Sequence, residues 1–232
     1  MSLLTVEHYE HFATHGFVVI EDVLSEEEVT SARHSLHESI YSQTGIRHRG
    51  DNWASADIGP RLKGPGMTMY YSKWKLQNIQ LHEKAVCTYQ DLFKRTWGPG
   101  DIADFKHPFG YSDERNVRVM TDRVCYRMPD CISKEGGLAL HLDRNPLDPY
   151  LEHSGGIDKW RPIQGFMSLT DHYDGGQGGL KVVPGFHKLV DSYFSSDQVS
   201  VEVKEQCIGH RGEFFRMGGK SYTKLQKQLE VL

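Results

Sequence analysis

His141 and Asp143 have the residue types and the spacing that could bind a redox metal. They lie in the segment Leu138–Asp143, where every second residue of an extended chain would point to the same face. The imidazole and the carboxylate would then project together, while Leu140 and Leu142 are buried on the other side. Such a pair is half of a facial triad, in which two histidines and one carboxylate hold Fe(II) and leave positions open for co-substrate and oxygen. From spacing alone, an ordinary ion pair or surface feature stays open as the alternative.

Helical patterns fill the first hundred residues, which must support this segment. Apolar residues three and four apart predict a short helix over residues 6–16. Ser25 and Glu28 form a capping box, so a second helix is predicted to begin there and to run to about Tyr41. A third helical pattern covers residues 74–97 and is stopped by glycine and proline.

Short strands separated by turn residues are predicted in the remainder, at 117–128, 137–143, 162–170 and 180–183. Helices followed by strands indicate an α+β chain whose β part is a sandwich, barrel or jelly roll. We therefore expect a single domain over residues 1–232, helical to about residue 100 and a β-roll from about 101.

Composition narrows the class of protein. The 232 residues include 27 basic and 31 acidic side chains, a net charge of −4, which argues against a nucleic-acid binder but not against a small anionic substrate. No apolar run has the length of a membrane span, and no secretory signal or peroxisomal address is visible, so the expected location is the cytoplasm. The four cysteines form no C-x-x-C pair and are expected to be reduced.

The order of several segments resembles the phytanoyl-CoA dioxygenase family of Fe(II)/2-oxoglutarate oxygenases. These segments are residues 12–20, His141–Pro146, Trp160–Asp171 and the Gly179–Lys188 stretch, which ends in a PG-x-HK turn. The resemblance implies a double-stranded β-helix, a cupin-like jelly roll, with N-terminal and flanking helices. It also implies Fe(II) as cofactor, 2-oxoglutarate and O2 as co-substrates, and hydroxylation of a small-molecule or acyl-type substrate. His141 and Asp143 match the family's metal-binding segment.

The family's second histidine and its arginine for 2-oxoglutarate lie on a later strand that we do not find here. We therefore expect the roll to be incomplete at its C-terminus, with the third ligand unassigned. His210, ten residues before Lys220, is one candidate for that ligand, although a loop histidine is the plainer interpretation. His187 lies in the PG-x-HK turn, where the family's histidine is not a ligand.

Tyr126 and Gln164 are the candidate contacts for 2-oxoglutarate, because both side chains could donate hydrogen bonds to a carboxylate. Gln164, Phe166 and Ser168 would share one face of their strand. The alternative is that Tyr126 and Gln164 are polar core residues with internal partners.

Two other functions fit the sequence. One is a catalytically inactive jelly-roll binding protein that kept the scaffold and lost the metal. The other is a zinc or other divalent-metal enzyme that does not use 2-oxoglutarate. A small molecule is the expected partner in each case, and the oligomeric state is not readable from the sequence.

Overall fold

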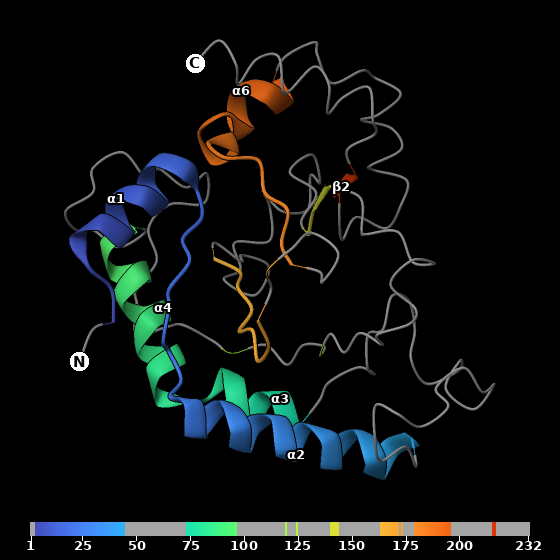
Figure 1. Ribbon diagram of the computed structural model, residues 1–232. Helices are drawn as coiled ribbons and strands as arrows, with labels where there is room; N and C mark the ends of the chain where they lie inside the picture. Colours follow the sequence, from blue (N-terminus) through green and yellow to red (C-terminus); the bar gives the residue numbers. More distant parts are fainter. Residues whose placement is uncertain are drawn as a thin grey trace.

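The structure is a computed structural model that describes residues 3–44, 73–96, 119, 124, 140–143, 163–171, 173, 179–195 and 215–216 (Figure 1). Tyr126 and His210 lie outside these residues. Within the described part of the chain, none of the helices is long and apolar enough to cross a bilayer.

Helix α1 spans Val6–His15, as the apolar spacing predicts. Its first turn is closed by a reciprocal pair of bonds: the His8 amide donates to Thr5 Oγ1 at 3.4 Å, and the Thr5 amide donates to His8 Nδ1 at 3.1 Å. The helix ends at Gly16, whose φ of 76° is left-handed and whose amide donates to the carbonyl of Phe12.

Helix α2 spans Glu26–Thr44, three residues beyond the predicted end. The predicted capping box is confirmed. The Ser25 amide donates to Glu28 Oε2 at 2.7 Å, and the Glu28 amide donates to Ser25 Oγ at 3.2 Å.

The prediction of one continuous helix over residues 74–97 is wrong. The chain forms α3, Lys73–Lys75, then a π-helical turn η1, Leu76–Gln80, and then α4, Glu83–Thr96. Asn78 donates its side-chain amide to the carbonyl of Trp74 at 2.9 Å, and the Leu81 amide reaches back five residues to Leu76. The apolar spacing alone does not reveal this change of hydrogen-bond register.

Two apolar clusters form the described core. The first joins α1 to α4 and contains the buried residues Leu4, Tyr9, Phe12, Leu92 and Phe93. The second joins α2 to α3 and η1 and contains the buried residues Ala32, Leu36, Ile40, Trp74, Ile79 and Val124. The extended segment 163–169 touches both clusters, because Ile163 packs on the first, and Met167 and Leu169 pack on the second.

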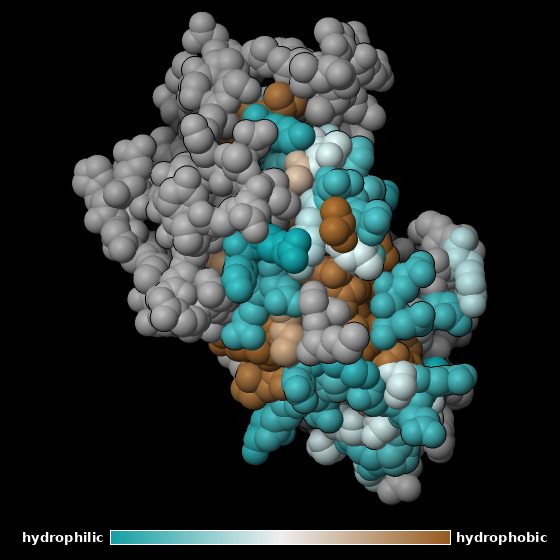
Figure 2. All heavy atoms as spheres, turned by 90° about the vertical axis from the view of Figure 1, so that its left-hand side faces the viewer, coloured by the Kyte–Doolittle hydropathy of each residue, from teal (hydrophilic) through white to brown (hydrophobic). Residues whose placement is uncertain are grey.

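Polar residues predominate on the face formed by α1 and α4, and apolar residues show between them (Figure 2). Val6 and Val19 are among the exposed apolar residues of the N-terminal part. Scattered apolar side chains of this kind are normal on protein surfaces.

The described ladder is short. Strand β1, His141–Leu142, pairs antiparallel with β2, Phe215–Arg216, and the register sets His141 opposite Arg216. The sequence predicts strands at 162–170 and 180–183. Of these, residues 163–168 and 180–183 run as extended chain and have no ladder partner among the described residues (Figure 1). The jelly roll therefore stays a prediction.

The PG-x-HK turn docks on the end of α1. The Gly185 amide donates to the carbonyl of His15 at 2.9 Å, and His187 Nε2 lies 3.0 Å from the carbonyl oxygen of Ala13. The turn continues into the 3-10 helix η5, Phe186–Lys188, and then into α6, Val190–Ser195.

Candidate metal centre

His141 and Asp143 lie side by side at the end of β1. The imidazole Nε2 is 3.2 Å from Asp143 Oδ1, and the two side chains are 32% and 42% exposed. Leu140 and Leu142 are both less exposed than the polar pair. The alternation over residues 140–143 therefore places the imidazole and the carboxylate together, within reach of solutes.

Gln164 holds the other oxygen of the same carboxylate. Its Nε2 donates to Asp143 Oδ2 at 2.7 Å, from the extended segment that bridges the two core clusters. This contact between residues 21 apart was not anticipated from the sequence. The Gln164 amide has a second N–H, so its hydrogen bond to 2-oxoglutarate stays a prediction.

The face shared by Gln164, Phe166 and Ser168 is confirmed. All three are exposed, whereas Ile163, Met167 and Leu169 are partly buried against the core. Alternation thus places the Gln164 amide on the open side of the segment, where Asp143 lies.

The donor atoms fit a divalent metal. Two neighbouring ligands of an octahedral ion, each about 2.1 Å from it, lie about 3 Å apart. The separation of 3.2 Å between His141 Nε2 and Asp143 Oδ1 agrees with that geometry. Gln164 contacts Oδ2, so Oδ1 is the oxygen on the side of His141, and hydrogen-bonded carboxylate ligands are the rule in metal sites.

The described residues contain no group of three or more histidine, cysteine, aspartate or glutamate side chains that could hold a metal. The predicted co-substrate contact Tyr126 and the candidate third ligand His210 lie outside the described residues, so their roles stay predictions.

His187 contacts α1 rather than the histidine–aspartate pair. Burial lowers the pKa of His187, and its Nε2 lies against the carbonyl of Ala13. A Cβ added at Gly16 would overlap the His187 ring, so the turn sits close against the backbone of residue 16. This histidine packs the turn onto the helix.

The ladder sets the backbone of Arg216 opposite that of His141, a pairing that the sequence did not reveal. The pair of residues Phe215–Arg216 is too short to give a periodic signal, which is why sequence reasoning overlooked it.

The chain is similar to one curated protein of Dictyostelium discoideum, named "Putative phytanoyl-CoA dioxygenase". The two are 25% identical over 213 residues, covering 81% of this chain and 57% of that protein. The chain thus spans a little over half the length of the curated relative it matches. No family model matches the chain. No solved structure matches it either.

Proposed function

We propose that this protein is an Fe(II)- and 2-oxoglutarate-dependent dioxygenase with a double-stranded β-helix fold. The observation that carries the proposal is the pairing of His141 Nε2 with Asp143 Oδ1 at 3.2 Å, at the segment that resembles the family's metal-binding motif. The similarity to a protein named as a phytanoyl-CoA dioxygenase supports the same class of reaction.

In this proposal His141 and Asp143 are two of the three protein ligands of the metal. Gln164 orients the carboxylate through Oδ2, so that Oδ1 stays beside His141 Nε2, where these two atoms would bind the metal together. Bound Fe(II) supplies the activation of oxygen, with 2-oxoglutarate as the reductant that becomes succinate and CO2. The partial exposure of both ligands allows co-substrate and substrate to approach the same face.

The third ligand is the residue that decides between an active and an inactive protein. His210 is a candidate, and Tyr126 and Gln164 are the candidate contacts for 2-oxoglutarate. The substrate class, a small molecule or an acyl-type compound, follows from the resemblance and is part of the proposal.

The proposal is tested by turnover. The full chain, incubated with Fe(II), 2-oxoglutarate and O2, is expected to form succinate, which is measured by mass spectrometry. His141→Ala should abolish succinate formation, because it removes a metal ligand. His34→Ala, an exposed histidine of α2, is the matched control and should retain the wild-type rate.

Two results would contradict the proposal. Succinate formation that is equal in wild type and His141→Ala would place the metal elsewhere. A folded chain that binds no iron and forms no succinate would identify the inactive jelly-roll binding protein instead.

A further inference from the structure

We propose that Tyr89 of α4 is a positioning residue for the metal site, acting through Gly165 and Gln164 on the Asp143 carboxylate. The inference rests on the proposed function, because it assigns Asp143 a metal-binding role. It adds a helical residue, far from the histidine–aspartate motif in sequence, to the machinery of the site.

The backbone at Gly165 passes directly over the Tyr89 hydroxyl. A Cβ added at residue 165 would overlap Tyr89 Oη, whereas the next nearest atom, Cζ, would lie 3.4 Å away. The φ of Gly165 is not in the left-handed region, so conformation alone does not require glycine there. The close approach of the tyrosine is the feature that requires a residue without a side chain.

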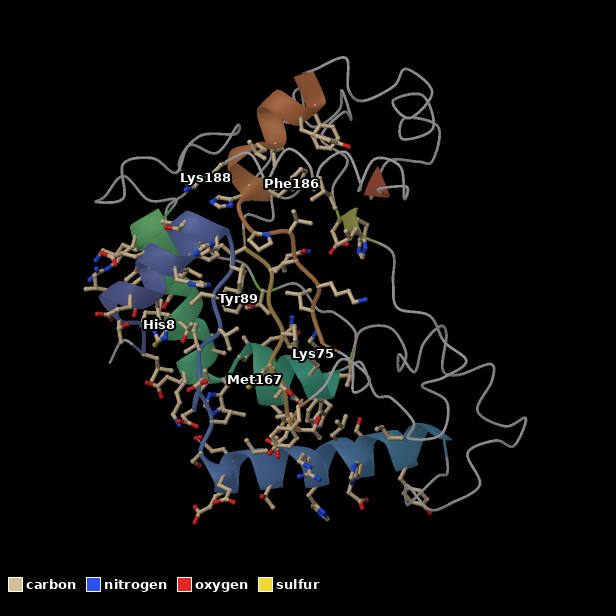
Figure 3. The ribbon with its side chains drawn as sticks, turned by 45° about the horizontal axis from the view of Figure 1, so that its top comes forward. His8, Lys75, Tyr89, Met167, Phe186 and Lys188 are labelled. Atoms are coloured by element: carbon tan, nitrogen blue, oxygen red, sulfur yellow. The ribbon has the colours of Figure 1, made fainter. Side chains whose placement is uncertain are left out.

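Tyr89 is a firm support for this backbone. It projects from α4 toward the extended segment that carries Met167 (Figure 3). Burial raises the pKa of the Tyr89 hydroxyl, which therefore stays neutral in the physiological range. The helix itself is anchored in the first core cluster through Leu92 and Phe93.

The supported segment has little freedom on either side of the contact. Ile163 is packed in the first cluster, and Met167 is packed in the second. Gln164 and Gly165 span the distance between these anchors, and Gln164 donates to Asp143 Oδ2 at 2.7 Å. A displacement of the backbone at residue 165 will therefore move the Gln164 amide relative to the carboxylate, and loss of such an outer-shell bond typically weakens metal binding 10–100-fold.

The test is a rescue experiment with Gly165→Ala, Tyr89→Phe and the double variant. The added methyl group in Gly165→Ala should weaken Co(II) binding about tenfold or more, measured by calorimetry. Tyr89→Phe removes the oxygen that lies against Gly165 and should weaken Co(II) binding by a smaller factor than Gly165→Ala does, because the ring remains. The double variant should recover to within about threefold of Tyr89→Phe, because its methyl group then meets only Cζ at 3.4 Å.

A second readout needs no metal. The two side-chain amide protons of Gln164 should have widely separated NMR shifts, because only one of them is bonded to a carboxylate. The separation should shrink in Gly165→Ala and return in the double variant. This result would support the positioning role even if wild type bound no Co(II), which would count against the proposed function alone.

Several outcomes would overturn the inference. Unchanged Co(II) affinity and amide shifts in Gly165→Ala would do so, as would a loss that Tyr89→Phe fails to rescue. If Gly165→Ala does not fold, the double variant is compared with Tyr89→Phe alone. A Co(II) affinity that differs more than about threefold between those two would also overturn it.

Discussion

At the scale of single residues, the two oxygens of one carboxylate in the site have different partners. Asp143 presents Oδ1 to His141 and Oδ2 to Gln164. An amide donor stabilises the ionised carboxylate without adding charge, so the pair keeps its attraction for a cation. The nature of residue 164 therefore matters as much as its position.

Gln164→Leu should weaken Co(II) binding by about tenfold or more, because it removes the amide that donates to Asp143 Oδ2 at 2.7 Å and orients the carboxylate. Calorimetric titration measures the effect, and binding as tight as that of wild type would contradict this account of Gln164.

Gly16→Ala should destabilise the fold more than Gly179→Ala does. Both glycines have positive φ, which costs another residue about 1–2 kcal/mol. At Gly16 the new methyl group would also overlap the His187 ring, whereas nothing lies within 4 Å of a Cβ at Gly179. Urea unfolding of the two variants gives the comparison, and equal losses would show that the turn does not press against residue 16.

At the scale of elements, an ion pair joins the start of α2 to the start of α4. Glu28 Oε2 lies 2.7 Å from Lys84 Nζ, and His82 Nε2 is 3.5 Å from Glu28 Oε1. The hydrogen bond from Lys84, followed by that from the Ser25 amide, lowers the pKa of Glu28 to about 2. Glu28 therefore serves both as the cap of one helix and as the link to the other.

Glu28→Gln should lower the midpoint of thermal unfolding at pH 7, because it removes the charge that Lys84 binds. In the folded chain the pKa of the Glu28 carboxyl is about 2, below its ordinary value of 4.5, so the folded protein takes up this proton only at lower pH. Its contribution to stability is thus complete above pH 4.5 and is lost as the pH falls toward 2.

The difference in unfolding midpoint between wild type and Glu28→Gln should accordingly narrow as the pH falls from 4.5 toward 2. Glu27→Gln, an exposed neighbour in the same turn, is the control for the charge of the helix start. A gap that stays constant down to pH 2.5 would contradict the pairing with Lys84.

At the scale of the whole molecule, the segment 163–169 connects the helical core to the candidate metal site. Ile163, Met167 and Leu169 of this segment pack on the core clusters. Gln164, on the opposite face, donates a hydrogen bond to Asp143. The helices thus set the position of a residue that contacts Asp143, although none of them carries a predicted metal ligand.

Met167→Ala should lower the free energy of unfolding by about 2–3 kcal/mol, because Met167 packs against the second core cluster. Phe166→Ala, one residue earlier, should change it by less than about 0.5 kcal/mol, because that side chain is 59% exposed. Chemical unfolding of both variants measures the contrast. A larger loss for Phe166→Ala would show that the opposite face of the segment is buried.

The sequence predicts the local parts of this structure well and the long-range parts poorly. The capping box at Ser25, the end of α1 at Gly16 and the alternation around Gln164 follow from neighbouring residues. The π-helical turn occurs together with a side-chain bond from Asn78 to the carbonyl of Trp74, which apolar spacing does not reveal. The contacts of Gln164 with Asp143 and of Tyr89 with Gly165 join distant segments, so no local pattern encodes them.

The most direct test of the central claim is the absorption spectrum of the full chain with Fe(II) and 2-oxoglutarate without oxygen. If His141 and Asp143 hold the metal, wild type will show a visible charge-transfer band that depends on both additions. His141→Ala will lack the band, and His34→Ala will retain it. A band of equal intensity in His141→Ala, or none in the folded wild type, would contradict the claim.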